Sequence, residues 1–196
     1  GLDFHSPYGC SKGCADQYFR DYFRIYGLKT VVLRQSCIYG YRQFGVEDQG
    51  WVAWFAIAAM FGKELTIFGD GNQTRAFSYV KDVSPIIAKS IEVKDAYNQI
   101  FNIGADKPYT VNYLADIIRK MMGIPNHPIQ YLRERKEVKH AYSNHDKAKN
   151  ILGYEDKTSL KEGIKKMVDW AEKIKIKEGD RFENIEIIEN LPDVWK

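Results

Sequence analysis

The chain has 196 residues, of which 44% are hydrophobic and 28% are charged, and its formal net charge is +3. These values suit one globular unit, or one domain with part of another. No run of about 18 apolar residues occurs, which argues against a membrane span. The late lysines alternate with glutamates, which indicates a solvated helix face and argues against a nucleic-acid partner.

Three cysteines, Cys10, Cys14 and Cys37, form neither an even set nor a Cys-x-x-Cys pair. A disulfide framework is therefore not expected, and a reducing, cytoplasmic location is. The four histidines lack metal-ligand spacing, so no metal site is expected. No basic segment followed by an apolar stretch opens the chain, so we expect no signal peptide.

The first half of the chain alternates between helical and strand-like patterns. Ser6 and Pro7 suit a helix start, and aromatic residues recur at helical spacing as far as Gly27, which predicts a helix over 7–26. The β-branched run after it predicts a buried strand over 30–33. Later patterns predict an apolar helix over 51–61, a strand over 65–68, a turn over 69–72 and a strand over 77–80.

The second half continues this alternation, which predicts the α/β class. We expect a helix over 82–92 with Pro85 in its first turn, a strand over 100–104, and a helix from the cap Thr110 to 122. Ser143 or Asn144 is expected to start a short helix ending at 152. Ser159 is expected to start a long helix ending near 174. The tail from 175 is expected to pack on the body or on a partner.

Tyr8 and Lys12 lie four residues apart at a predicted helix start, so both side chains project from one face. A phenol with a pKa near 10 is a poor base at neutral pH, but a nearby ammonium stabilises the phenolate. Such a pair can take a proton from a sugar hydroxyl while a hydride leaves the carbon. The spacing alone is weak evidence, because many helices contain it by chance.

The surrounding segments strengthen this interpretation. The residues SPYGCSK at 6–12, the helix after them, and CIYG at 37–40 resemble the active-site region of extended short-chain dehydrogenase/reductases. GDGNQTR at 69–75, YVKDV at 79–83, FNIG at 101–104, LGY at 152–154 and SLKEG at 159–163 match further landmarks of that family. YRQF at 41–44 and DQGWV at 48–52 are similar to the CDP-paratose 2-epimerase (tyvelose epimerase) branch of the sugar-nucleotide epimerases and dehydratases.

The resemblance implies the C-terminal part of a two-domain enzyme. Residues 1–40 and 77–104 would be the remainder of an NAD-binding, Rossmann-like, doubly wound parallel sheet. Residues 41–76 and 105–196 would form a small mixed α/β subdomain that holds a nucleotide-diphosphate sugar. In the whole enzyme, a tightly held NAD would oxidise one sugar carbon and return the hydride to its other face. A CDP- or UDP-hexose is the expected substrate.

The resemblance also implies roles for individual residues. Tyr8 would be the general acid/base, and Lys12 would tune it and contact the nicotinamide ribose. Residues beyond the first strand would lie beside the nicotinamide: Gln35, Ser36 and Cys37. Arg75 would bind the substrate diphosphate, with Arg135, or less favourably Arg133, on the far side. The remaining substrate contacts would come from Thr66 and Phe68 at the base, and from Gln49 and Trp51 at the base or sugar.

The sequence departs from the family pattern in four places. It contains no glycine-rich turn of the kind that binds the dinucleotide pyrophosphate. The Ser/Thr that completes the catalytic set would lie before Gly1. Ala76 stands in place of a usual acidic residue, and Cys37 in place of a common asparagine. The first two departures predict that this chain alone neither holds NAD nor turns over.

Alternatives therefore remain open. A UDP-glucose 4-epimerase is the near alternative and an NDP-sugar 4,6-dehydratase a more distant one. An alternative of another class is a truncated, non-catalytic module for binding or dimerisation. The helix over 7–26 resembles the one through which family dimers associate, so we expect a homodimer through this helix.

Overall fold

The computed structural model describes residues 4, 6–46, 49–135 and 137–176. Most of the predicted C-terminal packing segment therefore lies outside the described residues. The described chain alternates helices with short strands, and most strand pairs are parallel. The predicted α/β class is confirmed, with parallel pairing as in Rossmann-like sheets.

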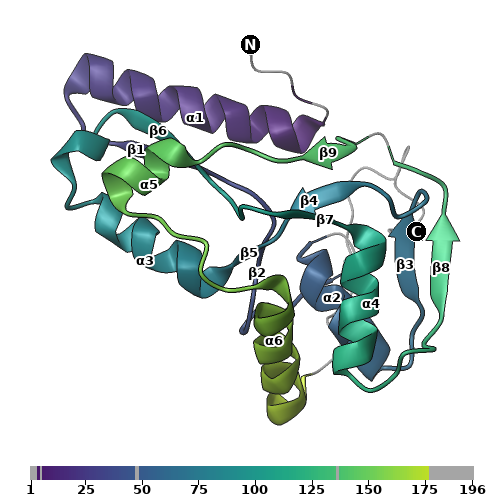
Figure 1. Cartoon of the computed structure of the whole chain (residues 1–196). Helices are drawn as coiled ribbons and strands as arrows, with labels where there is room; N and C mark the ends of the chain where they lie inside the picture. Colours follow the sequence, from purple (N-terminus) through teal and green to yellow (C-terminus); the bar gives the residue numbers. More distant parts are fainter. Residues whose placement is uncertain (1–3, 5, 47–48, 136, 177–196) are drawn as a thin grey trace.

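The first structural unit is built on the parallel pair of β1 (Val31–Gln35) and β6 (Gln99–Ile103). Helix α1 (Pro7–Tyr26) lies along one side of this pair, and α3 (Val80–Ser90) and α5 (Asp146–Leu152) lie on the other (Figure 1). A hydrophobic cluster joins α3 and α5 to the strands; its fully buried members include Phe101, Ile103, Leu152 and Tyr154. Helices on both sides of a parallel pair form the expected three-layer arrangement.

The second unit contains three helices and a separate parallel pair. Strands β3 (Leu65–Phe68) and β8 (Ile129–Leu132) pair in parallel beside α2 (Trp51–Met60) and α4 (Val111–Met121). Helix α6 (Leu160–Ile174) packs with α2 and α4 in the larger hydrophobic cluster. Helix α2 is apolar nearly all round because it is covered on most sides, and seven of its residues are buried.

Short strands connect the two units. Strands β2 (Ile38–Tyr39) and β5 (Ser78–Tyr79) form a parallel pair. Strand β4 (Thr74–Ala76) lies between the antiparallel β7 (Pro108–Thr110) and the parallel β9 (His140–Ala141). The remaining element is a 3-10 helix, Lys94–Ala96.

Most predicted elements are confirmed, and their ends follow the expected capping chemistry. Ser6 Oγ accepts a hydrogen bond from the Gly9 N–H at 3.1 Å, and Gly27 ends α1 in the left-handed conformation at φ 68°. Thr110 caps α4 and Ser159 caps α6 in the same way, through their side-chain oxygens. Strand β3 has the predicted bounds.

Several boundaries differ from the predictions. Val80 begins α3 directly after β5, so the predicted strand over 77–80 is shorter and Pro85 lies inside the helix rather than in its first turn. Helix α5 begins at Asp146, because Asn144 Oδ1 instead accepts from the Asp146 N–H in a local turn. Five short strands were not predicted, since each has only two to four residues and so carries little pattern: β2, β4, β7, β8 and β9.

An ion pair fastens α1 to β1. The Asp16 carboxylate, 6% exposed, accepts from Arg34 Nε at 2.6 Å, whereas the Arg34 side chain is 40% exposed. Thr30 Oγ1 also donates to the Phe19 carbonyl at 2.9 Å. The pair is asymmetric, because Asp16 depends on its partner for charge compensation while Arg34 also reaches water.

This asymmetry predicts unequal costs for the two truncations. Arg34→Ala leaves a buried, unpaired carboxylate and should lower the free energy of unfolding by about 2–3 kcal/mol. Asp16→Ala leaves a solvated guanidinium and should cost about 1 kcal/mol. Urea denaturation measures both values. Arg24→Ala is the control, because Arg24 pairs with Asp21 at an exposed site on α1. Equal losses from Arg34→Ala and Arg24→Ala would contradict the argument.

Candidate functional site

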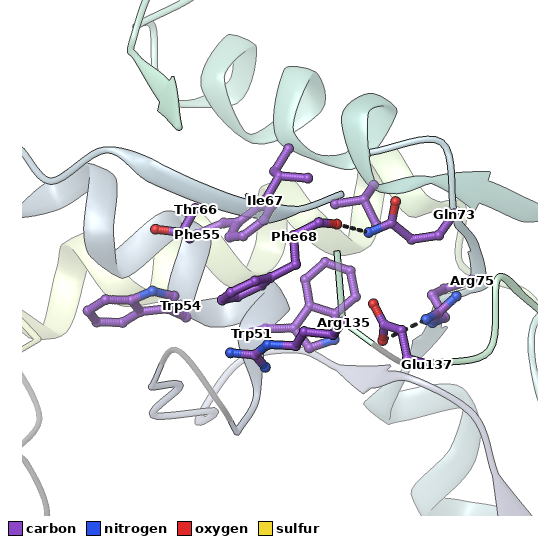
Figure 2. Close-up of a pocket in the computed structure, with 11 residues that line it drawn as sticks. Trp51, Trp54, Phe55, Thr66, Ile67, Phe68, Gln73, Arg75, Arg135 and Glu137 are labelled. Atoms are coloured by element: carbon purple, nitrogen blue, oxygen red, sulfur yellow. Dashed lines mark hydrogen bonds and ion pairs between the residues drawn. The ribbon is translucent and has the colours of Figure 1, made fainter. Parts of the chain in front are cut away.

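Two of the hollows on the described surface contain predicted site residues, and the first is an aromatic pocket between α2, β3, β4 and the loop after β8. It encloses about 200 Å³. Trp51 packs edge-on against Phe55 and Phe77, which fixes the ring at the pocket wall. Figure 2 shows the lining side chains converging from these separate elements: Trp51, Trp54, Phe55, Thr66, Ile67, Phe68, Gln73, Arg75, Val111, Arg135 and Glu137.

Arg75 is the buried cation of the aromatic pocket, at 8% exposure. Its Nη1 donates to the carbonyls of Thr74 at 2.9 Å and Lys139 at 3.2 Å, and its Nη2 donates to Glu137 Oε2 at 2.9 Å. These contacts hold the planar group in one orientation. A buried, oriented guanidinium presents its remaining N–H groups to phosphate or carboxylate oxygens.

A second arginine covers the opposite wall. The Arg135 guanidinium carbon lies 3.5 Å from the centre of the Phe68 ring, as a stacked cation–π contact (Figure 2). Gln73 Nε2 donates to the Phe68 carbonyl at 2.8 Å and so fixes the end of β3. The pocket therefore combines flat aromatic surface with two guanidinium groups, which suits a ligand with both a ring and anionic oxygens.

The second hollow is a groove between α1 and β1 of about 640 Å³. Tyr8, Lys12 and Gln35 line it together. Lys12 Nζ lies 5.3 Å from the centre of the Tyr8 ring, so the two side chains share one face of α1 as their spacing predicted. Tyr8 is 65% exposed.

Ser36 and Cys37, which were predicted to lie beside the nicotinamide, line neither hollow. The Ser36 N–H donates to the Ile103 carbonyl at 3.0 Å, and Ser36 Oγ donates to the Ala76 carbonyl at 3.2 Å. The end of β1 is thereby tied to both β6 and β4. Burial raises the pKa of the Cys37 thiol to about 11, against a smaller lowering by nearby Arg75 and with a further increase from Glu137. Cys37 therefore lies within electrostatic reach of the aromatic pocket.

The structure groups most of the predicted site residues. Five of the predicted substrate contacts line the aromatic pocket: Trp51, Thr66, Phe68, Arg75 and Arg135. Gln49 does not; it is exposed, and its backbone bridges to Val46. Arg133 is exposed and outside the pocket lining. Within the described residues, no helix is long and apolar enough to cross a membrane, and no group of His, Cys, Asp or Glu side chains is placed to hold a metal.

Trp54, Gln73 and Glu137 also line the pocket and were not predicted from the sequence. Gln73 lies within the GDGNQTR segment, so its position beside Arg75 was a usable signal. Trp54 is one helical turn from Trp51 on α2. Glu137 had no local signal, because only the pairing of β4 with β9 brings its loop to Arg75.

The family model described as "NAD dependent epimerase/dehydratase family" matches residues 2–104, which is more than half of the chain. The chain belongs to this family. A CDP-paratose 2-epimerase from Salmonella typhi is 38% identical over 185 residues, covering 88% of this chain and 54% of that protein. A putative UDP-glucose 4-epimerase from Methanocaldococcus jannaschii is 39% identical over 165 residues, covering 84% of this chain and 53% of its own length.

Solved structures of the family agree in fold. A UDP-glucose 4-epimerase from Thermotoga maritima with UDP-glucose is 37% identical with a TM-score of 0.79, covering 87% of this chain and 55% of that one. A UDP-glucuronic acid 4-epimerase from Bacillus cereus in complex with UDP-glucuronic acid and NAD is 27% identical, with a TM-score of 0.78 and coverage of 87% and 54%. The chain spans about half the length of the relatives it matches.

The raised pKa of Cys37 predicts that its thiol is alkylated more slowly than the exposed thiols of Cys10 and Cys14. At pH 8 a thiol of pKa about 11 is ionised in roughly one molecule in a thousand, and the thiolate is the reactive form. Iodoacetamide should therefore modify Cys10 and Cys14, which are exposed and serve as internal controls, well before Cys37. Raising the pH toward 10 should speed the labelling of Cys37. Mass spectrometry of tryptic peptides measures the rates, and equal rates for Cys37 and Cys10 at pH 8 would contradict the prediction.

Proposed function

We propose that this chain forms the substrate-binding part, together with the Tyr8–Lys12 pair, of an NAD-dependent nucleotide-sugar epimerase. One observation carries the proposal: a buried, oriented Arg75 lies in a pocket whose other walls are aromatic. Nucleoside diphosphates combine a flat base with phosphate oxygens, and this pocket offers a partner for each. Family membership supports the same ligand class.

The pocket geometry supports specific roles. Phe68 and Thr66 border the base, and Trp51 shapes the base or sugar site. Arg75 binds the diphosphate from the floor of the pocket, and Arg135 binds it from the other wall after leaving its position over Phe68. Gln49 stays a proposed contact only at the entrance, since it does not line the pocket.

Tyr8 and Lys12 supply the acid/base chemistry in this proposal. The Tyr8 phenolate takes a proton from a sugar hydroxyl and later returns it, and the Lys12 ammonium stabilises the phenolate that is present before the first transfer and after the second. The chemistry that NAD would supply there is reversible hydride transfer with the sugar carbon. Tyr8, Lys12 and Gln35 share one groove, so they fit the nicotinamide end of this cofactor. Ser36 and Cys37 close that end toward the aromatic pocket.

Within this class, we propose a CDP- or UDP-hexose substrate and a 2-epimerase. The similarity to the CDP-paratose 2-epimerase supports this choice, and the DQGWV segment led to it. UDP-hexose 4-epimerases of comparable similarity support the near alternative, and the 4,6-dehydratase is the more distant one. Three unpaired cysteines support a reducing, cytoplasmic setting.

We also propose the division into two parts. Residues 1–40 and 77–104 belong to the Rossmann-like part, and residues 41–76 and 105–196 to the substrate part. The two hydrophobic clusters support a division into two parts, and the larger cluster also takes in Tyr39, Phe77 and Tyr79 from the Rossmann-like ranges. Helix α5 packs in the cluster of β6, so its packing partner is the Rossmann-like part although its sequence position lies beyond residue 105.

Nucleotide binding tests the proposed pocket. Isothermal titration calorimetry with CDP and UDP should detect binding to this chain, and Arg75→Lys should weaken it about tenfold or more, because lysine lacks the planar fork. Arg119→Lys is the matched control, because Arg119 lies on α4 outside the pocket lining and pairs with Asp116. Failure of both nucleotides to bind the unmodified chain would overturn the proposed ligand class.

A melting-temperature measurement with added NAD tests the alternative of a non-catalytic module. The 196 residues contain no Gly-x-x-Gly-x-x-Gly turn, so millimolar NAD should leave the melting temperature of this chain unchanged. A clear increase would contradict that expectation and would count against a module that only binds or dimerises.

We further propose a homodimer through α1. This helix exposes an unusual number of large apolar side chains: Tyr18, Phe19, Tyr22, Ile25 and Tyr26. On a helical projection these positions fall on one side of α1, and contiguous exposed apolar surface is typical of an association site.

Light scattering at micromolar concentration tests the dimer. The unmodified chain should show the dimer mass, and Tyr18→Glu with Tyr22→Glu should give the monomer mass, because two charges would be desolvated in the interface. Ile91→Glu is the matched control, because Ile91 is equally exposed at the end of α3. A monomeric mass for the unmodified chain would refute the dimer.

A further inference from the structure

Glu137 occupies the anion position of the aromatic pocket. Its Oε2 lies 2.9 Å from Arg75 Nη2, and Figure 2 shows the two side chains pointing toward one another across the pocket edge. Glu137 is the only carboxylate among the described residues that line the pocket, against two guanidinium groups, Arg75 and Arg135. The carboxylate thus lies where an anionic ligand oxygen would bind.

The three partners of Arg75 differ in how firmly they are held. The Thr74 carbonyl belongs to β4, and the Lys139 carbonyl precedes β9, which pairs with β4 in parallel. Glu137, by contrast, extends from the loop between β8 and β9, and its side chain is 45% exposed while that of Arg75 is 10% exposed. Glu137 is therefore the partner that can leave Arg75 and return to water at low cost.

The need to balance the charge of Arg75 explains its ion pair with Glu137. A guanidinium that is nearly buried is costly without a counter-charge. Glu137 supplies that charge through one hydrogen bond, whereas the two carbonyls are neutral and stay in place. A phosphate oxygen offers the same charge-assisted hydrogen bond to Nη2, together with further acceptors for Arg135.

We propose that Glu137 is a built-in counter-ion that competes with the ligand phosphate for Arg75. It stabilises Arg75 in the free protein and is displaced when a phosphate enters the pocket. Glu137 then lowers the affinity for anionic ligands and leaves the affinity for neutral ones unchanged. The role of the diphosphate rests on the proposed function, but the competition itself concerns any phosphate anion.

Calorimetric titration of the whole chain with inorganic pyrophosphate, CDP and UDP tests this inference. Glu137→Gln keeps the side-chain shape and removes the charge, so it should bind pyrophosphate and the nucleotides roughly three- to tenfold more tightly than the unmodified chain. Glu134→Gln is the matched control, because Glu134 lies on the same loop, is exposed and does not line the pocket. It changes the net charge equally and should leave the affinities unchanged. Cytidine and uridine, which carry no phosphate, should bind both variants and the unmodified chain alike.

The outcomes separate this inference from the proposed function. Tighter pyrophosphate binding by Glu137→Gln, with no binding of CDP or UDP to any variant, would support the competition and overturn the nucleotide pocket. Equal or weaker anion binding by Glu137→Gln would overturn the competition and show that Glu137 positions Arg75 instead, whatever the nucleotides do. An equal gain from Glu134→Gln would also overturn it, because general electrostatics would then explain the effect. Absence of any anion binding overturns it as well, since a released Arg75 should bind pyrophosphate.

Discussion

The burial of the Arg75 guanidinium is the constraint on which the rest of the site depends. A charged group with so little exposure needs both a counter-charge and acceptors for its N–H groups. Arg75 obtains them from the short strand β4, from the residue before β9 and from the loop that precedes it. The pairing of β4 with β9 therefore does more than extend a sheet. It brings together the groups that make a buried cation tolerable, and with them the floor of the aromatic pocket.

Contacts of β4 also connect the aromatic pocket with the groove between α1 and β1. Strand β4 ends at Ala76, whose carbonyl accepts from Ser36 Oγ at the end of β1. Strand β1 in turn carries Gln35 into the groove that contains Tyr8 and Lys12. Ligands of parallel α/β sheets bind beyond the carboxyl ends of the strands, and Gln35 and Ser36 lie at the carboxyl end of β1.

Packing also explains why the site walls are rigid on one side and adjustable on the other. Trp51 and Phe55 belong to a helix that is buried on most sides, and Phe68 ends a strand that is paired along its length. Arg135 and Glu137 lie on the loop between β8 and β9, where the side chains are exposed. Aromatic surface is therefore held in advance, while the charged groups can rearrange around an incoming anion. Such a division favours binding with little backbone reorganisation.

Local chemistry made much of the fold predictable from the sequence. Ser6, Thr110 and Ser159 determine helix starts because each caps its own helix within three residues, and Gly27 ends α1 because the left-handed turn there favours glycine. The pairing of Tyr8 with Lys12 on one face is likewise a property of one helix, and motif resemblance located Arg75, Thr66 and Phe68. Tertiary structure alone decided that Glu137 meets Arg75 and that Gln49 stays outside the pocket, as it decided the existence of β4. The contact between Glu137 and Arg75 depends on the pairing of β4 with β9, strands more than sixty residues apart, and no local pattern records such a pairing.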